Sequence, residues 1–340
     1  MEAKQKISDF REELDKTLAS PSLSSKESIR KLVQNQMHSS SSEVQEHRVT
    51  ELCNLLDLMR SASGDHLKAS KTSGASHGAW MVLCLKCHNI SDYTYEVGAK
   101  TLFFYPQLKE DNNDYRVMYR KGPEGSPFHT LLAEGYVDAP LDVCLCAGWE
   151  VSMYNKWFPR YNVPPFKVIA CCCLKKIGIN EHVSLVRMKV PWPLSQREVV
   201  FDYFEMEYLE DGLVIVLLNS VSDTDVDKYM EEFKKFELPN SKDSVRMDLK
   251  VGGFAMKKIT SNRSYFRLVG NLDLKLDFIP PWLLNFILRQ LFGGACKLFQ
   301  KTVVSLAKND EDFHTALEDP LFLRIRENLL NSEVLDPKAT

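Results

Sequence analysis

One continuous stretch, Ser184 to Ser220, sets the strongest limit on what this chain can fold into. It reads SLVRMKVPWPLSQREVVFDYFEMEYLEDGLVIVLLNS and combines strand-like runs with two breaks. The first break is Pro191-Trp192-Pro193, because proline has no N–H to donate to a sheet and fixes its own φ angle. The second is Glu210-Asp211-Gly212, which is typical of a hairpin turn. The stretch predicts paired strands and one loop that carries a large apolar ring.

Similar strand-like runs recur before and after this stretch. They are WMVLCLKC, DYRVMYRKG, FHTLLAEGYV, FKVIACCCLKK, VRMDLKVGGFAMKKI and SYFRLVGNLDLKLDF. Period-two spacing predicts that one face of the fifth run carries Val245, Met247, Leu249 and Val251. In the last run it predicts that Phe266, Leu268, Leu272, Leu274 and Leu276 share a face. A long antiparallel meander with one apolar face needs a cover.

A helical segment near the end of the chain supplies this cover. After Ile279-Pro280-Pro281 comes WLLNFILRQLFGGACKLFQKTVVSLAKN, whose apolar residues recur at helical spacing. Gly293-Gly294 lies inside it, where glycine permits a kink or close packing at about 1 kcal/mol per residue. A shorter internal helix is expected to start at Asp138-Ala139-Pro140, since proline suits the first helical turn.

The chain divides into four parts by pattern. Residues 1–60 are predicted to be a helical region, with Ser24 or Ser25 capping its second helix. Residues 61–78 are small and polar and predict a flexible linker. Residues 79–310 form the main domain, and residues 311–340 a tail with a short amphipathic piece. The N-terminal helices either dock on the main domain or bind a protein partner.

Composition excludes several classes of protein. A formal net charge of −3 and a pI near 6.3 show no basic excess, so nucleic acid is not an expected partner. The N-terminus lacks the apolar core of a signal peptide, and the nine cysteines are an odd number. Both observations favour reduced thiols in a cytoplasmic protein, and a peripheral position at membranes is left open. No uncharged window is long enough to predict a membrane-spanning helix.

Several separate segments are similar to one known family. PWPLSQRE before a hairpin, then GGFAMKKI, then IPPWLLNFILRQL resemble the StAR-related lipid transfer (START) domain. CLCAGWE, PFHTLLAEGYVD and RKGP fit its plant-type polyketide cyclase/dehydrase and lipid transport superfamily. The resemblance covers roughly residues 80–310. It implies an α+β helix-grip fold, in which a curved antiparallel sheet wraps around a long C-terminal helix, here with an added N-terminal helical region.

The resemblance also implies a cavity that binds one lipid between the sheet and this helix. The residues expected to line it are Arg187, Tyr203, Met247, Leu249, Phe266, Leu268, Trp282, Phe286 and Ile287. The loop next to the family's Arg-Asp pair, here Arg197-Glu198, is expected to close the mouth. That loop carries Trp192, Pro193 and Leu194. An apolar cavity of this kind gains about 0.8 kcal/mol per lipid CH₂ buried, and its ligand enters only if a lid moves.

The kind of lipid is left open by the residues. Sterol-carrying members of the family place a buried acid and arginine on neighbouring strands, where this sequence has Ser184 or its neighbours and Tyr203. A phospholipid or fatty acyl ligand is therefore at least as well supported as a sterol, with Arg187 as a cation for a phosphate if it points inward. Trp192 and Leu194 would contact a membrane surface during exchange, unless Trp192 packs inward as a plug.

Other motifs support neither a cofactor nor an enzyme. Cys84-Leu85-Lys86-Cys87-His88 matches a haem-attachment pattern, but on a strand its two cysteines face opposite sides. The cysteines at 144, 146 and 171–173 have no second pair at zinc-finger spacing. Asp223 begins an EF-hand-like pattern that fails at its sixth and twelfth places. The polar strand residues His129, His182, Glu134, Glu205 and Glu207 form no recognised catalytic set. We expect no cofactor, no metal and no catalytic residue. Because related helix-grip proteins include cyclases and hydrolases, an enzyme of that kind stays open as the alternative.

Overall fold

The computed structural model describes residues 7–37, 40–63, 81–82, 96–97, 100–101, 114–163, 165–192, 194–229, 244–276 and 291–335. The helices are α1 Ile7–Leu18, α2 Pro21–Ser24, α3 Lys26–Gln36, α4 Ser42–Arg60, α6 Leu141–Trp149, η2 Val151–Met153, α7 Tyr154–Trp157, η3 Leu209–Asp211, α8 Asp223–Val226, η4 Asp227–Tyr229, α11 Gly294–Asn309, α12 Glu311–Leu317 and α13 Pro320–Leu335. The strands are β1 Met81–Val82, β2 Glu96–Val97, β3 Lys100–Thr101, β4 Tyr115–Lys121, β5 Phe128–Val137, β6 Tyr161–Asn162, β7 Pro165–Lys176, β8 Glu181–Lys189, β9 Gln196–Tyr208, β10 Leu213–Ser220, β11 Ser244–Arg246, β12 Asp248–Thr260 and β13 Arg263–Asp273.

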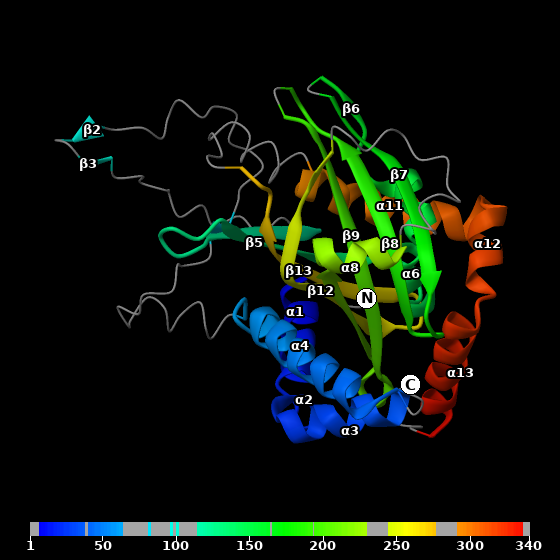
Figure 1. Ribbon diagram of the computed structural model, residues 1–340. Helices are drawn as coiled ribbons and strands as arrows, with labels where there is room; N and C mark the ends of the chain where they lie inside the picture. The colour runs from blue at the N-terminus through cyan, green and yellow to red at the C-terminus, as the bar shows by residue number, and fades with distance from the viewer. Residues whose placement is uncertain are drawn as a thin grey trace.

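A single large sheet is the centre of the fold. Its strand order is β1-β4-β5-β13-β12-β10-β9-β8-β7-β6, with the short β11 pairing in parallel with one end of β9. All other pairings in this sheet are antiparallel. The predicted hairpin forms between β9 and β10, and Gly212 makes its turn at a φ of 58°, a left-handed conformation that glycine adopts without steric cost. The α+β class and the curved antiparallel sheet are as predicted (Figure 1).

The two faces of the sheet are covered by different parts of the chain. We call the face toward α6 and α11 the inner face, and the face toward α1, α3 and α4 the outer face (Figure 1). Alternate residues of each strand supply the two layers, as the period-two pattern predicts. On β5, for example, Ala133 packs in the inner cluster and Leu132 in the outer one.

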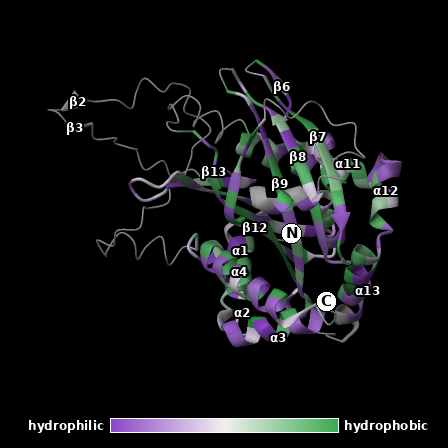
Figure 2. Cartoon of the chain, in the orientation of Figure 1, coloured by the Kyte–Doolittle hydropathy of each residue, from purple (hydrophilic) through white to green (hydrophobic). Residues whose placement is uncertain are grey.

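The N-terminal helices dock on the outer face. Leu14, Leu52 and Leu56 are fully buried there with strand residues such as Phe204 and Ile215. Figure 2 shows hydrophobic and hydrophilic residues side by side on α1, α3 and α4, as expected for helices covered on one side. This arrangement agrees with the first of the two expectations for this region.

The N-terminal helix boundaries follow from serine caps. The side chain of Ser25 accepts a hydrogen bond from the backbone N–H of Ser28 at the start of α3, so Ser25 is the cap of the predicted pair. Ser41 accepts from the N–H of Val44 in the same way at the start of α4. Each cap satisfies a backbone donor that has no partner within its helix.

The prediction of a shared face for the alternating residues from Val245 to Val251 is wrong in part. Met247 and Leu249 lie in the inner cluster, but Val251 packs against the outer one. The reason is a register shift between Leu249 and Val251 where β12 pairs with β13, which adds a residue and turns the following side chain over. Period-two spacing cannot reveal such a bulge.

The C-terminal segment is part of the inner layer. Phe313 of α12 and Leu321, Phe322 and Ile325 of α13 are buried in the inner cluster. The helix α13 contains the predicted amphipathic piece and packs against α6. The division of the chain at residues 60, 78 and 310 remains a prediction, although the buried side chains on both sides of 310 belong to one core.

The long covering helix is described from residue 291 onward. A π-helical turn over 291–293 leads into α11, so the backbone departs from regular α-helix at the predicted glycine pair. A Cβ at Gly294 would lie 2.5 Å from the Tyr161 hydroxyl, so the glycine permits close packing against this tyrosine. The short helix that the charged run after β10 predicts around Tyr229–Phe233 lies almost wholly outside the described residues, which end there with α8 and η4 at Tyr229.

Candidate functional site

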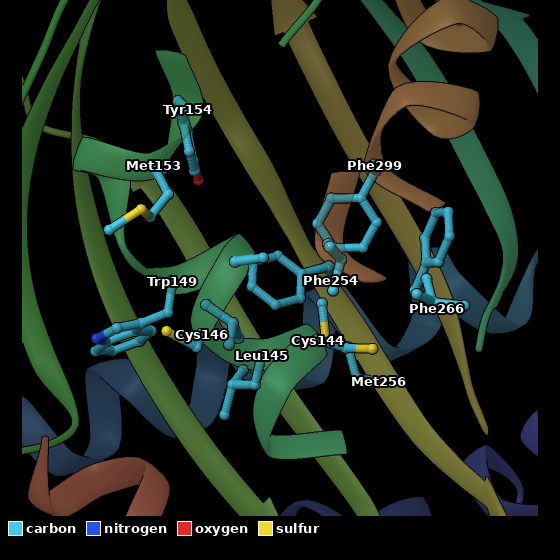
Figure 3. Close-up of a cluster of buried hydrophobic side chains, with 14 of the residues drawn as sticks. Cys144, Leu145, Cys146, Trp149, Met153, Tyr154, Phe254, Met256, Phe266 and Phe299 are labelled. Atoms are coloured by element: carbon cyan, nitrogen blue, oxygen red, sulfur yellow. The ribbon is translucent and has the colours of Figure 1, made fainter. Parts of the chain in front are cut away.

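The inner core is an aromatic and sulfur-rich layer between the sheet and α6, α7 and α11. Figure 3 shows residues of α6 facing Phe254 and Met256 of β12 and Phe266 of β13. The ring of Phe299, on α11, meets the ring of Phe266 with centroids 5.5 Å apart. Such a layer presents apolar surface from both the sheet and the helices.

Five of the nine predicted lining residues lie in this inner layer. Tyr203, Met247, Leu249 and Phe266 are buried in the inner cluster, and Leu268 packs against it while half-buried. They come from β9, β12 and β13 and from the link before β12, so strand pairing brings them together. Trp282, Phe286 and Ile287 lie outside the described residues.

Arg187 faces the other side of the sheet. It has the same side-chain direction as Val183 and Leu185, which form a separate cluster with Val226 on the outer face. Its Nη2 lies 2.7 Å from a carboxylate oxygen of Glu198, so the charge of this guanidinium is already balanced by an ion pair. The expectation that Arg187 meets a ligand phosphate in the inner core is therefore not supported by its position.

The polar groups around Tyr203 in the inner core are uncharged. The Tyr203 and Tyr154 hydroxyls lie 2.9 Å apart, and Tyr154 donates to the carbonyl of Gly148. The His182 ring stacks on Tyr203, and burial lowers its pKa to about 3, so it is neutral at physiological pH. Ser184 is fully buried, and its hydroxyl has no hydrogen-bond partner among the described residues.

One end of the inner layer keeps accessible apolar surface. The side chains concerned share two properties: they pack against the inner cluster, and they are only half-buried. They include Met188, Phe201, Leu268, Leu272, Leu274 and Phe292, while other side chains with the same two properties, such as Leu209 and Ala316, lie elsewhere along the layer. This end lies next to the loop with Pro191 and Trp192.

The predicted mouth loop is exposed at its tip. Trp192 is 85% exposed, so the alternative in which its ring packs inward as a plug does not hold. Leu194 is half-buried and packs near Phe166, and its N–H donates to the carbonyl of Pro191 to form a turn. Pro193 lies outside the described residues.

A second exposed apolar residue lies at the same end of the sheet. Val163, in the turn between β6 and β7, is 91% exposed. Lys167 and Lys189 are exposed and directly opposite each other on β7 and β8, just inside the two loop tips. Like charges in this position repel each other, so this pair favours an anionic neighbour.

The remaining polar candidates have local partners or burial that account for them. His129 hydrogen-bonds Tyr119, and Glu207 pairs with Arg324. Glu134 pairs with arginines on the outer face. Glu205 is fully buried with Oε2 3.7 Å from Arg324 Nη2, and desolvation raises its pKa well above the usual range. None of these carboxylates is paired with a histidine in the described chain.

The described cysteines do not come together in one cluster. Cys171 packs on the inner side, whereas Cys172 contacts the outer cluster with Val226, as alternation along a strand requires. Cys144 and Cys146 are buried on α6. The described residues contain no group of three or more potential metal ligands, and Cys84, Cys87 and His88 lie outside them. Among the helices of the described residues, none is long and apolar enough to cross a membrane.

A surface hollow of about 630 Å³ lies elsewhere, between the C-terminal half of α11 and the β12–β13 turn. Asp138 and Arg263 form an ion pair on its wall, and Asn262 and Lys308 at its rim are exposed. It is separate from the inner layer and contains none of the predicted lining residues.

The arrangement of sheet and helices is shared with solved structures. That of human STARD10 matches with a TM-score of 0.50 and 17% sequence identity, over 64% of this chain and 80% of that chain. Human StAR-related lipid transfer protein 5 matches with a TM-score of 0.45 and 13% identity, over 72% and 93%. The STAR-related lipid transfer protein from Xanthomonas axonopodis matches with a TM-score of 0.42 and 22% identity, over 58% and 97%.

The class of fold defined here is the α+β helix-grip fold, which confirms the prediction made from the sequence. The particular form of this fold is the one seen in human STARD10. No protein-family model matches the chain, and a comparison with curated proteins found no match.

Proposed function

We propose that this protein binds a single lipid in the inner layer between the sheet and α11, and transfers or senses it without catalysing a reaction. The observation that carries this proposal is the set of half-buried apolar residues at one end of the inner core, including Phe201, Leu268 and Phe292. Acyl chains or a sterol body would cover this surface and gain about 25 cal/mol per Å² removed from water.

The absence of a matched acid and base in the described inner core supports a non-catalytic role. His182 is the histidine nearest the centre of this layer, and its ring contacts are aromatic, with Trp149 and Tyr203. General acid–base catalysis needs a proton donor or acceptor within hydrogen-bond reach of the reacting group, usually oriented by a second polar side chain.

Contact with membranes is part of the proposal. Exposed Trp192 and Val163 would insert at the lipid–water interface, where tryptophan is favoured. Lys167 and Lys189 would contact anionic head groups beside them. The loop at residues 191–195 would then open while it touches the bilayer, and the lipid would pass into the inner layer. This role fits a protein that acts in the cytoplasm at membrane surfaces.

The test is direct recovery of bound lipid. Recombinant protein is incubated with a total lipid extract, repurified and measured by native mass spectrometry, with lipid identity read by tandem fragmentation. We expect a population heavier by the mass of one lipid. Protein that stays empty under all conditions would contradict the proposal.

A matched pair of variants locates the lipid. Leu268→Trp adds bulk to a half-buried position of the inner face and should lower lipid occupancy severalfold by filling the space. Leu58→Trp adds the same bulk at a half-buried position of α4 on the outer side and should leave occupancy unchanged. Equal loss in both variants would argue against the inner layer as the binding site.

In a second role, the N-terminal helices would bind a protein partner in response to bound lipid. This role is tested by measuring partner binding. Their apolar sides are occupied by the sheet, so a partner would contact their exposed sides. Charge reversal at exposed Glu12 and Lys16 of α1 should abolish partner binding and leave lipid uptake intact. Such a variant tests this role better than deletion of the helices, because deletion also uncovers the sheet.

A further inference from the structure

Among the described residues, one buried cation of the inner face has no carboxylate at ion-pair distance. Arg197 is 6% exposed and lies on β9, on the same face as Val199, Phe201 and Tyr203. It stands directly opposite Met188 of β8, one of the half-buried residues at the open end of the inner layer. From the sequence, Arg197 was recognised only as part of the Arg197-Glu198 pair next to the mouth loop. No face of the sheet was predicted for its side chain.

The hydrogen bonds of Arg197 hold the guanidinium in place but do not neutralise it. Nε donates to the carbonyl oxygen of Leu274 at 3.1 Å, and Nη1 donates to that of Ser195 at 2.8 Å. Within the described residues no carboxylate lies at ion-pair distance, and Nη2 makes no hydrogen bond there. Adjacent Glu198 faces the opposite side of the sheet, where Arg187 and Arg246 occupy its two oxygens.

This makes Arg197 an exception in the described chain. Its other buried arginines each pair with at least one carboxylate: Arg48, Arg116, Arg187 and Arg267. An uncompensated buried charge is expensive, because it loses its hydration without gaining a partner. A planar guanidinium with a free edge is well suited to bind a phosphate or carboxylate.

From these contacts we infer that Arg197 binds the anionic group of the lipid, a phosphate or carboxylate, at the mouth of the inner layer, while the chains extend inward past Phe201 and Leu268. This inference rests on the proposed function and specifies its ligand class. The deeper polar groups agree with it, since the Tyr203–Tyr154 pair and neutral His182 offer a negative head group no charge. The head group therefore stays near the loop at residues 191–195.

The test compares lipids that differ only in charge. Dioleoylphosphatidate is compared with dioleoylglycerol, and oleate with oleyl alcohol, by competition for the purified full-length protein. We expect at least tenfold tighter binding of the anionic member of one pair, since charge-assisted hydrogen bonds have this strength. The pair that shows the preference tells whether the anion is a phosphate or a carboxylate.

Variants then assign the preference to one residue. Arg197→Met should weaken binding of the preferred anionic lipid roughly tenfold and change that of its neutral counterpart less than twofold. Arg197→Lys should keep most of the preference. Arg246→Met removes a guanidinium at the same end of the sheet but on the opposite face, and should keep all of it.

The outcomes separate the two proposals. Binding of all four lipids with no preference for charge in the wild-type protein would overturn the role of Arg197 and leave lipid binding in place. Failure to bind any lipid would overturn both. A loss in Arg197→Met that is equal for charged and neutral lipids would show a purely structural role. The wild-type comparison stands even if a variant fails to fold.

Discussion

At the scale of single residues, the outer face contains a carboxylate surrounded by arginines. Glu134 is fully buried on β5, and its oxygens lie 2.5 Å from Arg116, 2.6 Å from Arg267 and 2.8 Å from Arg11. Arg267 also pairs with Asp15 of α1. Two residues of the first helix are thus bound to the sheet through one buried ionic cluster, which explains why strands with an apolar pattern also contain these charges.

The pKa of Glu134 makes stability depend on acid pH. Burial opposes its charged form, but the three arginines outweigh burial and hold the pKa at about 2, below the usual 4.5. A lowered pKa contributes stability above the unfolded-state value, here about 3 kcal/mol, and this is lost as pH falls from 4.5 toward 2. The free energy of unfolding, measured with urea at several pH values between 7 and 3, should decline accordingly.

The control for this pH dependence is Glu134→Gln. It should be destabilised at neutral pH by about 3–5 kcal/mol, since three arginines then surround a neutral amide. Its stability should fall less steeply between pH 4.5 and 3 than that of the wild type. Parallel pH profiles for the two proteins would show that other carboxylates cause the decline.

At the scale of elements, the loop between β8 and β9 is predicted to touch membranes through its tip. Trp192→Ala should leave the unfolding free energy within about 0.5 kcal/mol, since the ring is exposed. It should weaken binding to anionic vesicles roughly tenfold, through the loss of one buried aromatic contact. Vesicle co-sedimentation measures the affinity, and transfer between vesicles should slow in parallel.

The matched control lies at the other end of the same sheet. Ile177, in the turn between β7 and β8, is also exposed and apolar, at 52%. Ile177→Ala should bind vesicles like the wild type. If both substitutions reduce vesicle binding equally, the contact depends on general surface hydrophobicity and not on this loop.

The start of α11 depends on close packing at Gly294. Gly294→Ala would place a Cβ 2.5 Å from the Tyr161 hydroxyl oxygen, and we expect a loss of about 1–3 kcal/mol despite the better helix propensity of alanine. In a Tyr161→Phe background the oxygen is gone, and the same substitution should be neutral or stabilising. A double-mutant cycle by thermal unfolding measures this coupling; simple additivity would contradict the packing explanation.

At the scale of the whole molecule, the N-terminal helices belong to the folded core. Leu56 of α4 is fully buried against the outer face, whereas Val44 of the same helix is 43% exposed. Leu56→Ala should lower the free energy of unfolding by about 2–5 kcal/mol and Val44→Ala by less than about 0.5 kcal/mol. A single cooperative transition, followed by both tryptophan fluorescence and circular dichroism, would show that helices and sheet unfold together.

An independent N-terminal domain would give a different result. Leu56→Ala would then shift only an early helical transition and leave the fluorescence transition of the sheet unchanged. The buried ion pairs that join the two parts, such as Arg48 with Asp202 and Arg267 with Asp15, argue for the cooperative outcome.

Much of this architecture was predictable because its determinants are local. The strand runs, the β9–β10 turn with Gly212, the loop with Trp192 and the helix caps each depend on residues adjacent in sequence. The same is true of the amphipathic helices, whereas the helix-grip fold was implied by the resemblance of several segments to one family. Alternation also predicted a shared face for Met247 and Leu249 and another for Phe266 and Leu268, and all four residues lie on the inner face.

Only the tertiary structure decided the positions that depend on long-range register. Arg187 was expected inside and lies outside, while Arg197, from the adjacent strand, faces inward with no carboxylate partner in the described part of the chain. Val251 changes sides at a bulge. Side chains alternate with a period of two, so a single-residue shift in pairing exchanges the faces. The sequence by itself determined which elements form; the partners of its buried charges were set by pairings between distant strands and helices.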